Sequence, residues 1–332
     1  MRVLVTGGAG FIGSHVVDRL LLAGYEVMIL DDLSSGSREN VAHHHGERRF
    51  CAVFDSVLND RVVDTLVREA DLVLHLAAAV GVKYIIENPL HSMRVNVRGT
   101  ENVLESADRH RTRVILFSTS EIYGKSPDVP FREDADRLLG PTRIHRWSYS
   151  TAKAVDEILG LAYHEKHGLP VIVVRLFNTC GPRQRGRYGM VIPSFVDQAI
   201  RKQKITVYGD GTQTRCFCHV EDVVDGVMAL LTCDEADGEI FNIGSHEEVS
   251  IIQLARRVRQ LTESRSEIVL VPYSEAYEPG FEDMSRRVPD LRKIHEFVGY
   301  EPKRNLDDIL HSVIDHRRTV LDSERALGQD RG

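Results

Sequence analysis

A glycine-rich turn near the start of the chain constrains the fold more than any other feature of the sequence. The apolar run Met1–Thr6 is followed by Gly7, Gly10 and Gly13, and an amphipathic stretch begins there. In such a strand–turn–helix unit the first glycine permits a tight turn and the second lets backbone N–H groups approach a pyrophosphate. The third lets the helix pack on the strand, and the N-terminus of the helix favours the anion. The spacing therefore predicts a dinucleotide-binding turn.

The second apolar run supports a dinucleotide and indicates which one. Val27–Leu30 ends at Asp31. A carboxylate at this place can accept hydrogen bonds from the adenosine ribose, and it repels a 2′-phosphate. NAD is therefore favoured over NADP, although Arg38 leaves some room for NADP.

The first half of the chain alternates short strands with amphipathic helices. We expect helices at Ile12–Ala23 and Asn96–Arg109. The expected strands are rich in β-branched residues, as strands buried on both faces should be: Val3–Thr6, Val27–Leu30, Ala52–Phe54, Leu72–Leu76, Val114–Ser118, Val171–Leu176 and Ile240–Ile243. This alternation predicts an α/β fold with a Rossmann-type, doubly wound parallel sheet.

From about Cys180 the pattern changes. Gly181–Gly189 is rich in Gly and Arg, while Ile205–Tyr208 and Ile268–Val271 resemble strands and Leu306–Thr319 resembles a closing helix. We expect residues 1–179 to form the NAD-binding domain, with 213–245 returning to it. Residues 180–212 and 246–322 should form a smaller, interleaved α/β substrate domain, and 323–332 a flexible tail.

Composition excludes several classes of function. The net charge of −7 argues against a nucleic-acid partner, and no apolar run is long enough to predict a membrane span. The N-terminus shows no secretory leader, and five scattered cysteines indicate reduced thiols in a cytoplasmic protein. Cys216 and Cys218 lack a second pair at zinc-site spacing, and the triplet His43–His45 is interpreted as a solvated loop. We therefore expect no metal.

A tyrosine and a lysine carry the expected chemistry. Tyr149 and Lys153 are spaced to lie on one face of a helix, and they follow a strand that ends at Ser118–Glu121. The ammonium should favour the phenolate and draw the tyrosine pKa below its usual value of ~10. Such a tyrosine can take a proton from a hydroxyl while hydride leaves the same carbon for nicotinamide.

Taken together, the motifs resemble the extended short-chain dehydrogenase/reductase family over roughly residues 1–318. The motifs are Gly7–Gly13, His75–Ala78, Thr119–Gly124, Tyr149–Lys153 and Arg175–Asn178. The resemblance implies a sugar-nucleotide enzyme that reduces and reoxidises a tightly held NAD. It implies that Ala77 and Asn96 lie beside the cofactor, that Thr119 hydrogen-bonds the substrate 4-hydroxyl, and that Asn178 and Arg215 contact the nucleotide diphosphate. The other expected contacts are Phe11, Ile12, Asp32 and Asp55 with the cofactor, and Arg183, Val191 and Tyr208 with the substrate.

Within that family, three local features are similar to UDP-glucuronate decarboxylases: Thr119–Glu121, Arg146–Tyr149, and Tyr277–Asp283 followed by Arg287–Asp290. The last two also resemble apiose/xylose synthases, but those enzymes pair the glutamate with a cysteine where this chain has Ser120, so ring contraction is not expected. Oxidation of glucuronate at C4 gives a β-keto acid, which loses its carboxylate to leave an enolate. We expect Arg287 to hold the carboxylate, with Ser120 nearby, and Glu121 to reprotonate the carbon.

Several alternatives stay open at this stage. Arg287 could serve the diphosphate, and Glu121 could be the acid/base of a dehydratase. The sequence therefore predicts decarboxylation of UDP-glucuronate to UDP-xylose, with an NDP-sugar 4-epimerase or 4,6-dehydratase as rivals. An idle NAD-binding scaffold is disfavoured by the intact Thr119, Tyr149 and Lys153 set.

A homodimer is also expected, which the family resemblance implies through two helices of each subunit. The stretches Asn96–Arg109 and Ser150–His167 carry apolar residues such as Val155, Leu159 and Ala162 at helical spacing. The alternative is that these residues only cover the sheet.

Overall fold

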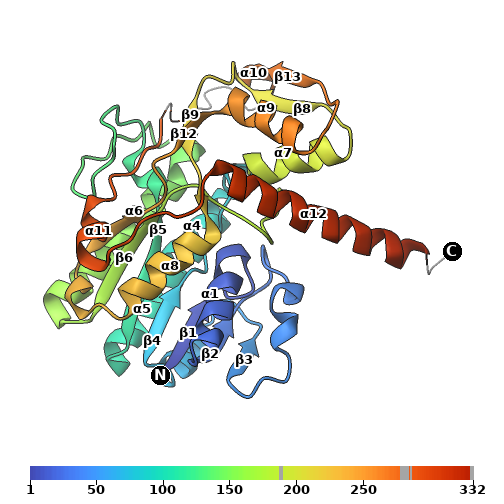
Figure 1. Cartoon of the computed structure of the whole chain (residues 1–332). Helices are drawn as coiled ribbons and strands as arrows, with labels where there is room; N and C mark the ends of the chain where they lie inside the picture. The colour runs from blue at the N-terminus through green and yellow to red at the C-terminus, as the bar shows by residue number, and fades with distance from the viewer. Residues whose placement is uncertain (187–189, 277–283, 285, 330–332) are drawn as a thin grey trace.

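Seven parallel strands form the central sheet, as the sequence predicts. The computed structural model describes residues 1–186, 190–276, 284 and 286–329. The strand order is β11-β6-β5-β4-β1-β2-β3 (Figure 1). The strands are β1 (Arg2–Thr6), β2 (Glu26–Leu30), β3 (Phe50–Val53), β4 (Leu72–His75), β5 (Arg113–Thr119), β6 (Val171–Leu176) and β11 (Ile240–Ile243).

The order of the strands reverses at β1, which pairs with β2 on one side and with β4 on the other. In an open α/β sheet this switch point opens a crevice at the carboxyl ends of the strands, where ligands bind. The glycine turn after β1, Asp31 after β2, and Thr119 at the end of β5 therefore all lie at one edge. The topology alone brings these distant segments of the chain together.

Helices cover both faces of the sheet. Apolar residues of α1 (Phe11–Leu22), α8 (Val220–Leu231) and α11 (Arg292–Val298) pack into one core with alternate residues of the strands. Those of α2 (Asp60–Arg68), α5 (Gly99–His110) and α6 (Ser148–His167) pack into the core on the opposite face. Because both faces are covered, strands such as β1 are buried along almost their whole length.

A second, smaller layer lies beyond the carboxyl ends of the sheet (Figure 1). Its core joins α7 (Val191–Ile200), α9 (Ile251–Leu261) and α12 (Leu306–Gln329) to the parallel pair β8 (Ile205–Tyr208) and β13 (Ile268–Val271). The remaining elements are α3 (Val82–Glu87), α4 (Pro89–Met93), α10 (Tyr273–Ala276), β7 (Thr179–Cys180), β9 (Thr214–Cys216), β10 (Cys218–His219) and β12 (Glu248–Ser250). Five short helical turns complete the chain: η1 (Arg38–His44), η2 (Arg94–Arg98), η3 (Ser120–Tyr123), η4 (His145–Trp147) and η5 (Asp234–Ala236).

The local structure differs from the expected one in two places. The tail beyond Ser323 was expected to lack regular structure and to be flexible; it is helical, since α12 continues to Gln329 and extends away from the body of the molecule (Figure 1). Its run of Glu, Arg, Ala and Leu has a high helix propensity, which outweighs its polarity. The histidine triplet is not a solvated loop either, because His43 and His44 belong to the helical turn η1 and contact α1.

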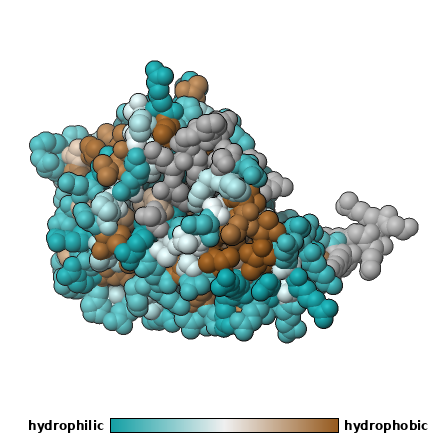
Figure 2. Space-filling model, turned by 90° about the horizontal axis from the view of Figure 1, so that it is seen from above, coloured by the Kyte–Doolittle hydropathy of each residue, from teal (hydrophilic) through white to brown (hydrophobic). Residues whose placement is uncertain are grey.

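The face of the molecule seen from above is largely hydrophilic, with apolar side chains gathered in separate patches (Figure 2). Among the described helices, none combines the length with the apolar character that crossing a bilayer requires. All five cysteines are free thiols, and Cys180, Cys216 and Cys218 are buried.

Candidate active site

In the glycine turn after β1, neighbouring backbone atoms lie so close that side chains larger than glycine's would not fit. Gly7 has a positive φ of 73°, a conformation that glycine adopts without strain. A Cβ on Gly13 would lie 2.1 Å from the carbonyl oxygen of Gly7. The backbone can therefore follow a tight path into α1, which begins at Phe11. This cradle at a helix N-terminus fits the pyrophosphate of a dinucleotide.

Asp31 holds the same turn from the neighbouring strand. Its carboxylate accepts hydrogen bonds from the backbone N–H groups of Ala9, at 2.9 Å, and Leu33, at 2.8 Å. Burial raises the pKa of this carboxyl, and the two N–H donors partly offset the rise. Asp31 thus has a structural task that the sequence did not reveal, beside the predicted one at the ribose.

The other predicted cofactor residues surround this edge of the sheet. Asn96 is buried, and its side chain accepts a hydrogen bond from the N–H of Ala79 at 2.8 Å and donates one to the Ala79 carbonyl. This contact fixes the backbone that follows β4, where Ala77 lies, half-buried. Asp55 follows β3 and accepts from Ser56 and Asn59, while Asp32 is exposed and accepts from Ser34.

The predicted catalytic pair begins α6. Tyr149 lies in its first turn, and Lys153 lies one turn later with 2% of its surface exposed. The Lys153 ammonium donates a hydrogen bond to Asp156 at 2.7 Å. Asp156 therefore neutralises the charge that was expected to act on the phenol.

The expected direction of the Tyr149 pKa shift is consequently wrong. Burial raises the pKa of the phenol, and the carboxylates of Glu121 and Asp156 raise it further. In the protein alone Tyr149 is protonated at neutral pH. A charge or hydrogen bond that stabilises the phenolate must come from what binds in the site.

The end of β5 presents the remaining catalytic candidates. Thr119 ends β5 and caps the helical turn η3, and its hydroxyl accepts a hydrogen bond from the N–H of Glu121 at 3.2 Å. Ser120 is 1% exposed. The Ser150 hydroxyl donates to the Glu121 carbonyl at 2.8 Å, which attaches η3 to α6. Thr119, Ser120, Glu121 and Tyr149 are thereby held on two elements that contact each other.

Glu121 is the centre of a buried charge cluster. Arg146 donates to both of its carboxylate oxygens, one of them at 3.0 Å, and the Arg287 guanidinium lies 3.6 Å away. Burial raises the pKa of Glu121, but the charges of Arg146, Arg287 and Arg215 outweigh burial and hold the pKa below its ordinary value. Glu121 is thus an ionised carboxylate at neutral pH.

Arg287 reaches this cluster because its segment pairs with the segment around Phe131. Phe131 donates its N–H to the Val288 carbonyl at 2.8 Å, and Asp290 donates to the Phe131 carbonyl at 2.9 Å. Phe131 also belongs to an apolar cluster that includes Trp147. Tyr277–Asp283, the motif that precedes Arg287 in the sequence, lies outside the described residues.

The predicted substrate residues divide into two groups. Asn178 donates to the carbonyl of Cys216 at 2.9 Å, next to the buried Arg215, whose charge acts on Glu121. Arg183 instead pairs with Asp18 of α1 at 2.8 Å. Val191 begins α7 and is half-buried, and Tyr208 ends β8 with 42% of its surface exposed.

Two buried arginines near the site were not assigned a role from the sequence. Arg146 was noticed only as part of a motif, although it is the closest partner of Glu121. Arg175 lies within the apolar strand β6, where it pairs with Glu157 at 2.7 Å and donates to the Tyr123 hydroxyl at 2.9 Å. A charged residue inside an apolar strand requires a buried partner, and this signal was present in the sequence.

Comparison with known proteins places the molecule in a family. The family model described as GDP-mannose 4,6 dehydratase matches residues 4–313. The chain belongs to this family. Membership confirms the resemblance to extended short-chain dehydrogenases/reductases, and with it the expectation of an NAD-dependent enzyme that acts on nucleotide sugars.

Individual relatives of this family cover nearly the whole chain. The chain is 41% identical to a UDP-N-acetyl-α-D-glucosaminuronate decarboxylase from Bacillus cytotoxicus, over 96% of this chain and 98% of that protein. It is 37% identical to UDP-glucuronic acid decarboxylase 1 from Xenopus tropicalis, over 97% of this chain and 73% of that one. Among solved structures, UDP-glucuronic acid 4-epimerase from Bacillus cereus, in complex with UDP-glucuronic acid and NAD, superposes with a TM-score of 0.87. It is 27% identical, over 96% of this chain and all of that one.

Proposed function

We propose that the protein decarboxylates UDP-glucuronate to UDP-xylose through a 4-keto intermediate. The observation that carries this proposal is the contact between Arg287 and Glu121, at the carboxyl end of β5 and beside Tyr149. A buried guanidinium beside Glu121, whose charge acts on Tyr149, can bind a sugar carboxylate by charge-assisted hydrogen bonds. The relatives named as decarboxylases of UDP-uronates, at 37% and 41% identity, support the same reaction.

The first half of the reaction needs Tyr149, Thr119 and Lys153. NAD, when bound, supplies the hydride acceptor and a positively charged ring that favours the phenolate. Tyr149 then removes the proton of the 4-hydroxyl, which Thr119 orients, and Lys153 holds the cofactor ribose. The residues that would hold NAD are Gly7, Gly10, Phe11, Ile12, Gly13, Asp31, Asp32, Asp55, Ala77 and Asn96.

The second half of the reaction needs Arg287 and Glu121. Arg287 orients the carboxylate of the β-keto acid, which departs as CO₂ and leaves an enolate. Arg287 lies 3.6 Å from Glu121, beyond a normal hydrogen bond, whereas Arg146 binds Glu121 directly. When Arg287 turns to the substrate, Glu121 loses one stabilising charge and gains a negative neighbour, so its pKa rises. Glu121 can then take a proton from water and deliver it to the carbon. The resulting 4-keto pentose would regain its hydride from the reduced cofactor and a proton from Tyr149, which gives UDP-xylose and restores NAD.

The nucleotide is assigned to the smaller layer. We propose that Asn178 and Arg215 contact the diphosphate, and that Val191 and Tyr208 approach the nucleoside from α7 and β8. Arg183 is the weakest of these assignments, because its guanidinium already pairs with Asp18. Val191, Tyr208 and Arg183 belong to the proposed substrate domain of residues 180–212 and 246–322, whereas Asn178 and Arg215 lie just outside it, on the segments that join it to the NAD-binding domain.

A 2-acetamido uronate is the second candidate substrate. The Bacillus cytotoxicus relative, at 41% identity, is named for UDP-N-acetylglucosaminuronate. The same Tyr149, Glu121 and Arg287 chemistry would serve it, because C2 does not take part in the oxidation or in the loss of the carboxylate. Only the space around C2 distinguishes the two substrates.

Mass spectrometry of the products tests the reaction directly. The purified enzyme is incubated separately with UDP-glucuronate, UDP-N-acetylglucosaminuronate, UDP-glucose and TDP-glucose, and Tyr149→Phe serves as the control. We expect loss of CO₂ from a uronate. Isomerisation of a uronate without a change of mass would instead identify a 4-epimerase, and loss of water from a glucose nucleotide a 4,6-dehydratase; either result would contradict the proposal.

Cofactor selectivity follows from Asp31 and Arg38. The guanidinium of Arg38 lies 3.9 Å from the centre of the Phe54 ring, a stacked position that withdraws it from a 2′-phosphate. We expect NAD to bind much more tightly than NADP in calorimetry. Equal affinities would contradict the role of Asp31, and loss of NADP binding in Arg38→Ala would then identify Arg38 as the cause.

We also propose that the protein forms a homodimer and is located in the cytoplasm. The helix α6, which packs beside α5, presents half-buried Val155 and Leu159, exposed Ala162, and Ile158 with 62% of its surface exposed, which fits a homodimer contact. Light scattering should give a dimer mass that Ile158→Glu reduces, and a monomer mass for the wild type would contradict the dimer. The free thiols fit a cytoplasmic protein.

A further inference from the structure

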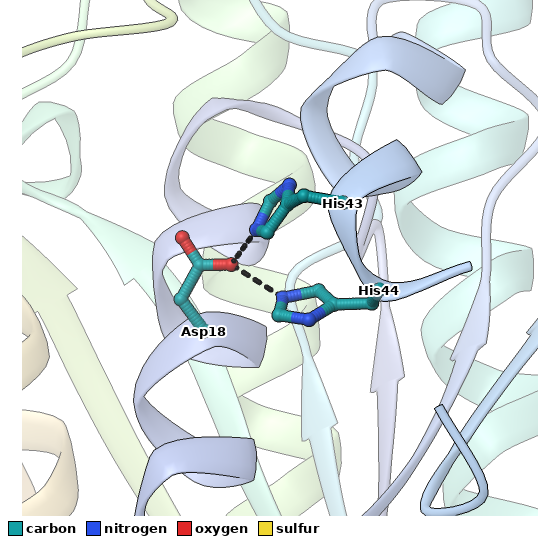
Figure 3. Close-up of side chains that lie close together, drawn as sticks. All are labelled: Asp18, His43 and His44. Atoms are coloured by element: carbon teal, nitrogen blue, oxygen red, sulfur yellow. Dashed lines mark hydrogen bonds and ion pairs between the residues drawn. The ribbon is translucent and has the colours of Figure 1, made fainter. Parts of the chain in front are cut away.

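Two histidines and an aspartate from different elements converge outside the active site. Asp18 lies on α1, and His43 and His44 lie at the end of η1 (Figure 3). The Asp18 Oδ1 atom is 2.8 Å from His43 Nε2 and 2.7 Å from His44 Nε2. All three potential ligand atoms lie within 4.8 Å of one another. One carboxylate oxygen is thus shared by two imidazoles that point to the same place.

The surroundings hold these three groups in position. Arg183 binds the other oxygen of Asp18, Oδ2, at 2.8 Å, so that Oδ1 is directed towards the histidines. The ring of His44 packs against Phe50 and is 12% exposed, and its Nδ1 faces Glu47 Oε2 at 3.9 Å. A carboxylate that orients the second ring nitrogen of a histidine, and a hydrogen bond to a ligating carboxylate, are the usual supports of a metal site.

We propose that Asp18 Oδ1, His43 Nε2 and His44 Nε2 bind a divalent transition-metal ion of the Zn²⁺ class. Two imidazoles and one carboxylate form a ligand set that suits Zn²⁺, and they leave one position of a tetrahedron for water. Imidazole nitrogens disfavour Mg²⁺ and Ca²⁺, which prefer oxygen ligands. Bonds of about 2.0–2.2 Å to a tetrahedral ion place ligand atoms about 3.3–3.6 Å apart, so each imidazole nitrogen must move away from Oδ1 by roughly half an ångström or more. The exposed side chain of His43 can provide this movement.

The ion would connect three segments around the cofactor-binding half of the molecule. The helix α1 begins at the glycine turn, η1 lies between β2 and β3, and Arg183 belongs to the segment that follows β7. Since Asp18 is bound by residues from the other two segments, an ion on Oδ1 would stabilise their arrangement. The site is separate from the Glu121 cluster, so its effect should appear as stability and not as a change in the reaction.

Titration of tag-free protein with Zn²⁺ tests this site. A histidine tag would bind the ion itself, so it must be absent, and the protein is first treated with a chelator. We expect calorimetry to show one Zn²⁺ per chain, and Co²⁺ to give the visible absorption of a site with nitrogen ligands. His44→Ala and His43→Ala should each weaken binding at least tenfold, and Zn²⁺ should raise the Tm of the wild type but not of these variants.

The neighbouring histidine provides the matched control. His45 is exposed, and in the described structure its side chain is not part of the convergent group. His45→Ala should therefore bind Zn²⁺ as the wild type does. Absence of saturable binding, a Tm that does not respond to Zn²⁺, or an equal loss in His45→Ala would each overturn the proposal.

Discussion

Two buried arginine–glutamate systems of the protein differ in how closely the arginines contact the carboxylate. The Glu157 carboxylate accepts hydrogen bonds from the Arg175 guanidinium at 2.7 Å and from the Ser118 hydroxyl at 2.5 Å. Arg175 also donates to the Tyr123 hydroxyl and to the Glu133 carbonyl. The Glu121 carboxylate accepts hydrogen bonds from Arg146, whereas the Arg287 guanidinium lies 3.6 Å away. The first system lies inside the fold, between β6 and α6, whereas the second lies at the carboxyl end of β5 beside Tyr149.

This difference separates structural charges from chemical ones. A buried pair whose hydrogen bonds are all made within the protein fixes the positions of the elements that carry it. Around Glu121, Arg146 makes the direct hydrogen bonds, so a ligand can engage Arg287 while the carboxylate stays paired. We therefore expect substitutions in the Glu157 system to change stability, and those around Glu121 to change catalysis.

Tyr149→Phe should give the largest effect on catalysis. Removing the phenolic hydroxyl removes the proton acceptor for C4 oxidation, so turnover should fall by about 10²–10⁴-fold. The content of bound NAD and the Tm should stay close to those of the wild type. A variant that keeps more than about a tenth of the wild-type turnover would contradict the assignment of Tyr149.

Arg175→Leu should give the largest effect on stability. The substitution leaves the Glu157 carboxylate buried without its guanidinium, which costs about 3–5 kcal/mol in the free energy of unfolding. Urea denaturation of Arg175→Leu and of Arg287→Ala compares the losses in the free energy of unfolding that the two substitutions cause. If Arg287→Ala lost as much stability as Arg175→Leu, the distinction between the two systems would be wrong.

The charge state of Glu121 predicts how stability depends on pH. Because its pKa is depressed in the folded protein, it stabilises the fold above the unfolded pKa of about 4.3, and this contribution is lost as pH falls through the folded pKa. The difference in unfolding free energy between wild type and Glu121→Gln should therefore grow as the pH rises from strongly acidic values to about 4.3. It should then stay constant to neutrality, having gained about 1.4 kcal/mol for each unit of depression.

Urea denaturation at a series of pH values measures this difference. A difference that shrinks as pH rises towards neutrality would mean that Glu121 has a raised pKa. It would then be protonated before substrate binds, contrary to the charge cluster.

Much of the sheet could be predicted from the sequence, because fully buried strands carry a dense apolar signal. All seven strands of the central sheet were expected within a few residues of their bounds, and so was the glycine turn. The arrangement of Glu121, Arg146 and Arg287 could not be read from local patterns. It depends on the bridge between Phe131 and Pro289, which is a contact between distant segments.

The error in the Tyr149 pKa has a more local origin. Asp156 lies three residues after Lys153, on the same helix face, and this spacing was visible in the sequence. A buried lysine with a carboxylate one turn away pairs with it, so its charge should not have been assigned to the tyrosine alone. The convergence of His43 and His44 on Asp18 differs, since it depends on the packing of η1 against α1.

The central claim is that Arg287 serves the carboxylate of the sugar, and a pair of dissociation constants tests it most directly. In a Tyr149→Phe background, which prevents turnover, UDP-glucuronate and UDP-glucose are titrated into proteins with and without Arg287→Ala. Arg286→Ala is the matched control, because that side chain is half-exposed and pairs with Glu248. We expect Arg287→Ala to weaken UDP-glucuronate about 10- to 100-fold more than UDP-glucose, since only the former offers a carboxylate to the guanidinium. Equal weakening of both ligands would assign Arg287 to the diphosphate and contradict the decarboxylase account.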